Sequence, residues 1–226
     1  MGFKSSFMEI PKHVAISLDN VFDWCRKNNK IINEQCSIYF GLLKKLLDLQ
    51  IKLNIPIFTV YLLPDAERPA DDYFLFSDCL ANFFNDLLIM PMISEQKIKI
   101  SIFGKWYNLP GKAIESLKKI IEETKDYDNF FVNFCINYDG QEEIVDACKL
   151  IAKQVELGKI DPEMITKETI KENIYSSYFL APDVIFIYGE RKFTGLLLWD
   201  SANSRIVFAE KSFMEFEESD FEKLME

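Results

Sequence analysis

Six short runs of apolar, β-forming residues recur along this chain, and segments with helical periodicity lie between most of them. These runs predict strands at residues 13–18, 57–63, 97–103, 129–136, 183–188 and 205–208. Continuous apolar runs of this length are typical of strands that are buried on both faces of a parallel sheet. Parallel neighbours need long crossover connections, usually helices. The alternation therefore predicts an α/β fold with a mostly parallel six-stranded sheet flanked by helices on both faces.

The segments between the strands have the apolar spacing of helices. We expect helices at residues 20–29, 32–53, 72–90, 109–124, 142–157 and 216–225, with short helices within residues 161–181. The 226 residues are 49% hydrophobic, which suffices for one sizeable core but not for two. The sequence has no internal repeat and no low-complexity linker, so residues 1–226 are expected to form a single domain.

The charge of the chain limits its partners. The formal net charge is −10, which argues against nucleic acid as the main partner because phosphate backbones bind basic surfaces. An anionic small substrate would need cations gathered locally against this background field. The five cysteines are odd in number and no pair has C-x-x-C spacing, which predicts reduced thiols.

The chain is also rich in aromatic residues, with twenty phenylalanines and nine tyrosines. Four of the phenylalanines fall in residues 74–84, where helical spacing would bury such an aromatic face. Such a face suits the core or a dimer contact, and it also suits the wall of an apolar tunnel. The sequence favours the first two and leaves the third open.

The first predicted strand begins at His13 and ends on a carboxylate, Asp19, before a helix that carries Trp24. In open α/β sheets, ligands bind outside the carboxyl ends of the strands. Asp19 is therefore either a site residue or the N-cap of the next helix, since Asp is a frequent N-cap. We interpret His13, the one histidine, as a residue that starts a strand and not as a base.

Several motifs occur along the chain, and their order is informative. Residues 13–24 read HVAISLDNVFDW, RPADDYF starts at Arg68, and residues 137–152 read NYDGQEEIVDACKLIA. Residues 189–204 read GERKFTGLLLWDSANS, and residues 213–225 read FMEFEESDFEKLM. Together these segments resemble the cis-prenyltransferase family, the undecaprenyl diphosphate synthases and their relatives. The resemblance runs from about residue 12 to residue 225 and implies the fold of that family.

The resemblance also implies an isoprenoid diphosphate as the ligand, because the family extends allylic diphosphates with isopentenyl diphosphate. It implies that Asp19 is a catalytic residue and a ligand of Mg²⁺. The substrate-binding residues that it implies are Asn20, Trp24, Arg68, Gly189, Glu190, Lys192, Thr194 and Arg205. Lys192 stands for an arginine of the family and can contact phosphate only as a point charge.

The chain departs from the family at both expected diphosphate sites. Val21 and Phe22 add bulk where a glycine-rich turn lets the backbone approach a phosphate. Asp23 stands in place of an arginine and would repel a diphosphate. Arg205 stands where the family has a carboxylate, and an arginine cannot ligate Mg²⁺, which counts against this cofactor.

These departures predict a family member that cannot elongate chains alone and acts as an accessory subunit of a hetero-oligomeric cis-prenyltransferase. The alternative is an active enzyme that uses Asp19 and the remaining cations for prenyl transfer, cyclisation or diphosphate release. The resemblance further implies a homodimer, or a heterodimer with a related prenyltransferase subunit. No secretory signal or membrane-spanning run occurs, so we expect a cytoplasmic protein. Because isoprenoid lipids partition into bilayers, peripheral membrane contact is a further option.

Overall fold

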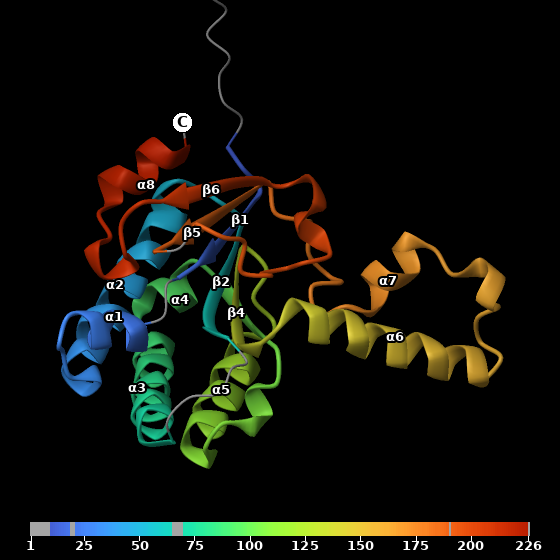
Figure 1. Cartoon of the computed structure of the whole chain (residues 1–226), viewed down its shortest axis with the longest axis horizontal. Helices are drawn as coiled ribbons and strands as arrows, with labels where there is room; N and C mark the ends of the chain where they lie inside the picture. The colour runs from blue at the N-terminus through green and yellow to red at the C-terminus, as the bar shows by residue number, and fades with distance from the viewer. Residues whose placement is uncertain (1–9, 19–20, 65–69, 190, 226) are drawn as a thin grey trace, which may run out of the picture.

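The computed structural model describes residues 10–18, 21–64, 70–189 and 191–225 (Figure 1). The strands are β1 (His13–Ser17), β2 (Ile57–Pro64), β3 (Ile98–Phe103), β4 (Phe130–Tyr138), β5 (Val184–Tyr188) and β6 (Arg205–Ala209). They form one sheet in the order β3-β4-β2-β1-β5-β6, and every neighbouring pair is parallel. The six strands expected from the apolar runs are thus confirmed, and the expected α/β class with them.

The expected helices are also present. They are α1 (Val21–Lys27), α2 (Ile32–Lys52), α3 (Ala70–Ile89), α5 (Gly111–Thr124), α6 (Gly140–Glu156), α7 (Lys167–Asn173) and α8 (Glu218–Met225). One further helix, α4 (Pro91–Glu95), was not expected, and Pro91 begins it because proline suits the first helical turn. Four 3-10 turns are η1 (Trp106–Asn108), η2 (Pro162–Met164), η3 (Asp200–Asn203) and η4 (Phe213–Glu215).

The main core lies on one face of the sheet. Alternate strand residues such as Val14, Ile16 and Phe186 point to this face, where they contact α1, α2, α3, α5 and α8. Val14 and Ile16 are fully buried, as is Ala15 between them on the other face. A strand that is buried on both faces explains why its sequence reads as a continuous apolar run.

The second face of the sheet is covered differently. Its smaller core cluster comprises Ala15, Ile57, Tyr61, Phe103, Cys135, Tyr138, Phe179, Ile185, Ile187, Leu196 and Leu197. Phe179, Leu196 and Leu197 lie in loops, so loops cover much of this face. The expectation of a helical layer on both faces is therefore corrected.

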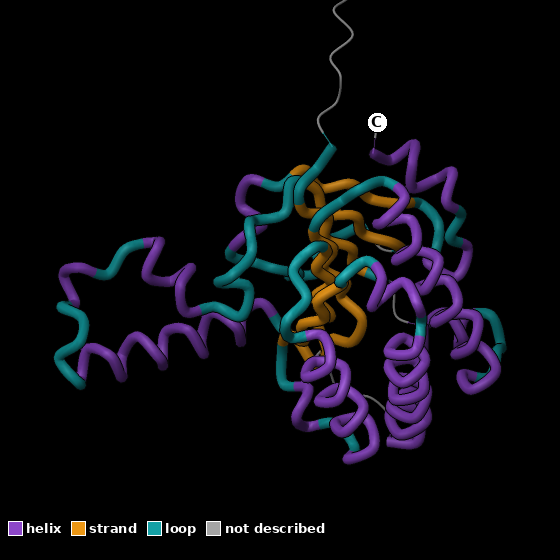
Figure 2. The backbone as a smooth tube through the Cα atoms, turned by 180° about the vertical axis from the view of Figure 1, so that it is seen from behind, coloured by secondary structure: helices purple, strands orange, loops and turns teal. Residues whose placement is uncertain are grey.

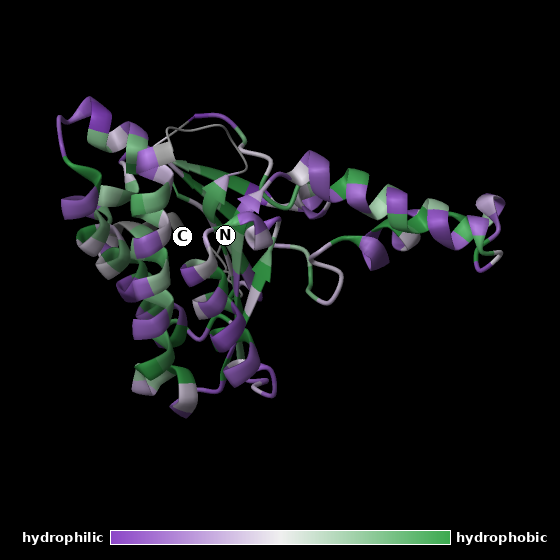
Figure 3. Ribbon diagram, turned by 90° about the horizontal axis from the view of Figure 1, so that it is seen from below, coloured by the Kyte–Doolittle hydropathy of each residue, from purple (hydrophilic) through white to green (hydrophobic). Residues whose placement is uncertain are grey.

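Helices α6 and α7 pack against each other and project from this side of the body as an arm, residues 140–173 (Figures 1 and 2). Viewed from below, the arm extends well beyond the sheet and carries apolar positions among polar ones (Figure 3). Its exposed large apolar residues are Val145, Leu150, Leu157, Met164 and Ile165. An arm that leaves apolar side chains in water is a candidate contact surface.

His13 starts β1 at the amino edge of the sheet and is fully buried, which agrees with its interpretation as a strand-start residue. Its Nδ1 lies 2.6 Å from the carbonyl oxygen of Leu180. Its Nε2 lies 2.8 Å from Oγ1 of Thr59. Burial lowers the pKa of His13 to about 4, so the ring is neutral at pH 7. The histidine thus holds strands together at the edge opposite to the pocket described below.

Candidate functional site

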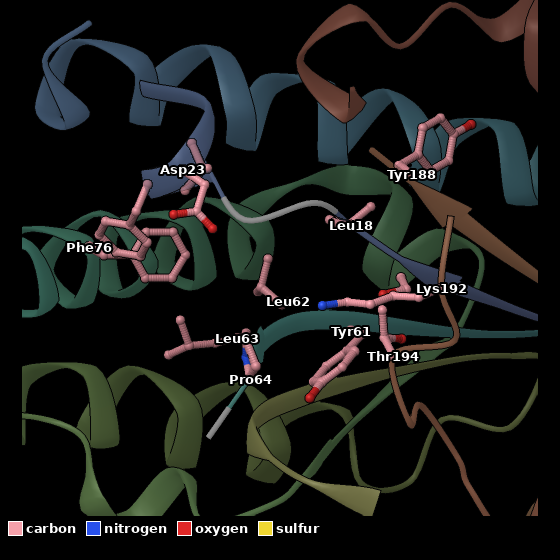
Figure 4. Close-up of a pocket in the computed structure, with 13 residues that line it drawn as sticks. Leu18, Asp23, Tyr61, Leu62, Leu63, Pro64, Phe76, Tyr188, Lys192 and Thr194 are labelled. Carbon is pink, nitrogen blue, oxygen red and sulfur yellow. The ribbon is translucent and has the colours of Figure 1, made fainter. Parts of the chain in front are cut away.

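A pocket of about 200 Å³ opens where β1, β2 and β5 end (Figure 4). The strands are parallel and in register, with Ser17 beside Tyr61 on β2 and Ile187 on β5, so their carboxyl ends meet at one edge. The pocket is lined by Ser17, Leu18, Val21, Phe22, Asp23, Tyr61, Leu62, Leu63, Pro64, Phe76, Tyr188, Lys192 and Thr194. The carboxyl edge of such a sheet is the usual ligand site of open α/β folds.

One side of the pocket is polar. Lys192 and Thr194 come from the loop after β5, and the ammonium group of Lys192 points into the cavity (Figure 4). Oγ1 of Thr194 is buried and has no hydrogen-bond partner among the described residues. A buried hydroxyl without a partner is costly, by about 1–3 kcal/mol. A ligand oxygen that accepts its hydrogen would remove that cost.

The backbone after β5 is bent back toward the pocket. Gly189 has a φ of +72°, in the left-handed region that glycine adopts without strain. Its N–H donates to the carbonyl oxygen of Lys211 at 3.1 Å, which fixes this turn. The turn lets the following residues return over the carboxyl edge, where Lys192 and Thr194 line the cavity.

The motif at residues 137–152 contacts the loop that carries Thr194 and fixes its position. Tyr138 accepts the N–H of Leu197 at 3.1 Å and donates its hydroxyl to Oε2 of Glu143 at 2.6 Å. Glu143 is fully buried, and burial raises the pKa of its carboxyl group. Gly140 is required here, because a Cβ on it would clash with the carbonyl oxygen of Gly195. The motif therefore fixes the segment that carries Thr194.

The other side of the pocket combines apolar side chains with one carboxylate. Phe76 lies opposite Lys192, and Asp23 lies beside Phe76 (Figure 4). The ring of Phe22, from α1, contacts that of Phe76, from α3, with 5.2 Å between their centroids. A cavity with a cation on one side and aromatic rings on the other suits an anionic head group joined to a hydrocarbon, and Asp23 adds a negative charge beside the rings.

The rim of the pocket carries an ion pair that the sequence analysis missed. Nη2 of Arg26 lies 2.6 Å from Oδ1 of Asp23, and Nη1 lies 3.5 Å from Oδ2 of Asp72. The hydrogen bond with Asp23 raises the pKa of Arg26. The charge of Asp23, which would repel a diphosphate, is thus offset locally. The spacing of three residues between Asp23 and Arg26 on a helix was the available signal.

Four of the residues predicted for the site lie outside the described residues. They are Asp19, Asn20, Arg68 and Glu190. Of the others, Lys192 and Thr194 are brought together in the pocket as expected, and Gly189 makes the turn that leads to them. Trp24 packs against the main core and is not among the residues that line the pocket.

The prediction for Arg205 is corrected by the sheet. Arg205 is the first residue of β6 and pairs with Val184, the first residue of β5, at the amino edge. The pocket lies at the carboxyl edge, roughly 13 Å away for a strand of this length. The chain must return to the amino edge before it can form another parallel strand. Arg205 was assigned to the diphosphate from its position after Trp199 in the sequence. That position does not show at which edge of the sheet the residue lies.

Ser17, Tyr61 and Tyr188 were also missed as pocket residues. Each lies at or near the end of a strand, which was a usable signal because these ends meet at one edge. Tyr61 donates its hydroxyl to the carbonyl oxygen of Tyr138 at 2.9 Å, so its ring is held in place.

The donors in the described residues do not form a resident metal site. No group of three His, Cys, Asp or Glu side chains that could hold a metal occurs in the chain where it is described. Asp23, a carboxylate that lines the pocket, is already paired with Arg26. Within the described ranges, no helix is long and apolar enough to cross a membrane.

Comparison with known proteins points in one direction. A family model described as "Putative undecaprenyl diphosphate synthase" matches residues 23–226. An isoprenyl transferase of Streptococcus thermophilus is 28% identical over 218 residues, which cover 92% of this chain and 86% of that protein. A tritrans,polycis-undecaprenyl-diphosphate synthase (geranylgeranyl-diphosphate specific) of Methanocaldococcus jannaschii is 30% identical over 221 residues, covering 94% of this chain and 78% of that one.

A solved structure shares the fold. It is lavandulyl diphosphate synthase from Lavandula x intermedia in complex with dimethylallyl diphosphate. It superposes with a TM-score of 0.89 over 96% of this chain and 94% of that one. The sequence identity is 22%, so this likeness is evidence for the fold alone.

Proposed function

The chain belongs to the undecaprenyl diphosphate synthase family of cis-prenyltransferases, and we propose that it binds an allylic diphosphate at the carboxyl edge and transfers its prenyl group. The family acts in isoprenoid diphosphate metabolism. The similar proteins are named as a transferase and a synthase, which supports an active enzyme over the accessory subunit expected from the sequence.

One observation carries this proposal. The same pocket holds the ammonium group of Lys192 and the buried hydroxyl of Thr194 on one side and, beside Asp23, an apolar wall on the other. The first pair can bind the oxygens of a diphosphate through charge-assisted hydrogen bonds. The wall, which includes Leu62 and Phe76, can hold the attached hydrocarbon.

In the proposed reaction, the bond between the allylic carbon and the diphosphate oxygen breaks, and the diphosphate leaves with the electron pair. The double bond of isopentenyl diphosphate attacks the allylic carbon, a new carbon–carbon bond forms, and the adjacent carbon loses a proton to the released diphosphate. Lys192 and Thr194 would stabilise the negative charge that develops on the leaving group. The apolar wall would keep water away from the cationic carbon.

We propose Mg²⁺ as an ion that arrives with the diphosphate and is held by the phosphate oxygens and Asp19, the ligand expected from the resemblance. Mg²⁺ is commonly bound by one or two carboxylates together with substrate phosphates. The bond changes of the proposed reaction do not depend on this ion.

The test is to measure pyrophosphate release by the purified chain from dimethylallyl, geranyl and farnesyl diphosphates, each with and without isopentenyl diphosphate. Release that requires both substrates would support prenyl transfer. Release from the allylic diphosphate alone would instead indicate hydrolysis or cyclisation. Binding without any release would contradict transfer by this chain alone.

The accessory subunit remains a second candidate because Phe22 and Asp23 line the pocket where the family has small and cationic residues. In that case, the chain would be captured from its own cells together with a related prenyltransferase subunit. Activity would then require both chains, and the purified chain would release no pyrophosphate.

For the partner, we propose a second copy of this chain. On β6, the edge strand, Ile206 and Phe208 are 38% and 41% exposed. They pair with Ile185 and Ile187, which belong to the core cluster of the second face. Parallel sheets are normally covered on both faces, so this apolar edge and the neighbouring arm support a homodimer. A heterodimer with a related subunit is the alternative.

A further inference from the structure

Two cysteines meet between α2 and α3, away from the candidate pocket. Cys36 lies on α2 and is 2% exposed, whereas Cys79 lies on α3 and is partly exposed. They are 43 positions apart in the chain, so no short motif contains both. Both line a cavity of about 370 Å³ that shares no lining residue with the candidate pocket. A small molecule that enters this cavity can therefore reach the pair.

The contacts between the two helices fix this pairing. Phe40 of α2 stacks on Phe83 of α3, with 4.8 Å between the ring centroids and 22° between the ring planes. One turn further along both helices, Nζ of Lys44 lies 2.9 Å from Oδ2 of Asp86. The residue numbers rise together, so α2 and α3 run parallel in this contact. Because residues four apart share a helix face, the positions one turn before the two rings also oppose each other, and these positions are the two cysteines.

The two thiol groups interact directly. The hydrogen bond with Cys79, together with burial, raises the pKa of the Cys36 thiol. The same hydrogen bond lowers the pKa of the Cys79 thiol. The thiolate is the nucleophilic form of cysteine, so Cys79 is the thiol better suited to attack an oxidant. Cys36 lies where a second, resolving thiol is needed.

We propose that Cys36 and Cys79 form a reversible disulfide that links α2 to α3 when the chain meets a low-molecular-weight disulfide of the glutathione class. Both cysteines are free thiols in the structure, which therefore describes the reduced form. This inference does not depend on the proposed function. The bridge would join two helices of the core, and one of them, α3, also contributes Phe76 to the candidate pocket.

The oxidation takes place in two exchange steps. The thiolate of Cys79 attacks one sulfur of the small disulfide, a mixed disulfide forms, and one small thiolate leaves with the electron pair. The Cys36 thiol then loses its proton, and its sulfur attacks that of Cys79 and releases the second small thiolate. The two protons from the protein thiols pass to the released thiolates. Two protein thiols are thus oxidised to one disulfide, and one small disulfide is reduced to two thiols.

The experiment treats the folded, purified chain with oxidised glutathione, blocks the remaining thiols and maps the disulfides by mass spectrometry after proteolysis. The variants are Cys36→Ser and Cys79→Ser. Cys148→Ser is the matched control, because Cys148 is an exposed cysteine on α6, far from this pair in the sequence. Thermal melts check that each variant is folded, and the disulfide map of the wild type does not depend on the variants.

We expect peptides joined through Cys36 and Cys79 in the wild type and in Cys148→Ser, and their complete loss after dithiothreitol. Cys36→Ser should instead retain glutathione on Cys79, because no neighbouring thiol displaces it. The bridged wild type should melt no lower than the reduced chain, since a bridge that fits the native helices restricts only the unfolded state.

Three results would overturn the inference. The first is a wild type in which Cys36 and Cys79 stay unmodified or carry only glutathione. The second is a bridge from Cys36 to the buried Cys25 in place of Cys79. The third is a bridged chain that melts below the reduced one, because the bridge would then form only by distorting the two helices.

Discussion

Arg26 lies 2.6 Å from the carboxylate of Asp23, one turn away on α1, and Asp23 lines the candidate pocket. Asp23 stands where the family has an arginine, so the sequence alone places a repulsive charge there. The guanidinium group offsets that charge. Both side chains are about half exposed, at 54% and 50%, so the offset is modest.

The first prediction concerns this pair. Arg26→Gln should weaken pyrophosphate binding by about fivefold, because the charge of Asp23 is then unopposed. Asp23→Asn should strengthen it by a similar factor. Titrations at about 0.15 M and 0.5 M salt provide a check, since screening should shrink both effects. Equal affinities of both variants and the wild type at low salt would contradict this account.

The second prediction concerns the cationic side of the pocket. Lys192→Gln should lower the affinity for an allylic diphosphate by roughly tenfold, because one hydrogen bond to a charged group contributes about 1.5 kcal/mol. Thr194→Val should lower it less, since its hydroxyl is neutral. Lys118→Gln, an exposed lysine on α5, serves as the control and should bind as the wild type does. Unchanged binding by Lys192→Gln would remove Lys192 from the site.

The third prediction concerns Tyr138, which fixes the segment that carries Thr194. Tyr138→Phe removes both the acceptor of the Leu197 N–H and a donor to the buried Glu143. We expect a loss of about 2–3 kcal/mol in the free energy of unfolding, because two buried polar groups lose a partner. Denaturant melts measure this loss. The control Tyr107→Phe alters an exposed tyrosine, and a Tyr138 variant as stable as that control would refute the role.

The fourth prediction is a pH dependence that originates at His13. Its pKa is about 4 in the folded protein and near 6.5 when unfolded, so the unfolded chain binds more protons between these values. The contribution of His13 to stability is therefore complete above pH 6.5. About 3 kcal/mol of it is lost as the pH falls to 4.

The comparison of wild type with His13→Asn isolates this effect from the buried Glu143, whose raised pKa acts with the opposite sign. Denaturant melts at pH 7.5, 6 and 4.5 should show a steeper loss of stability for the wild type. Parallel curves for the two proteins would show that His13 does not titrate as its burial requires.

The fifth prediction concerns the proposed homodimer. Phe208→Asp should dissociate it, because a charge at the apolar edge strand cannot be buried against a second copy without a large desolvation cost. Light scattering after gel filtration should give half the wild-type mass. Phe74→Asp alters an exposed phenylalanine on α3 and should leave the mass unchanged. A monomeric wild type would rule out the proposal.

Much of this fold could be predicted because its signals are local. Apolar runs such as residues 57–63 identify buried strands without reference to any other segment. Helical periodicity and end signals such as Asn54 and Pro56 bound α2 within a residue. The order of the motifs likewise identified the family, which the match to residues 23–226 confirms. Lys192 and Thr194 were found through the same motifs and do line the pocket.

By itself, then, the sequence determined the α/β class, the six strands and the family, since these depend on local patterns and on motif order. Only the tertiary structure decided that Arg205 lies at the amino edge, away from Lys192, because strand direction within a sheet is a property of the whole fold. The structure alone also decided that the rings of Phe22 and Phe76, 54 positions apart in the chain, lie in contact on one side of the pocket, with 5.2 Å between their centroids. Contacts between helices depend on how their crossovers pack on the sheet, and no local pattern records that packing.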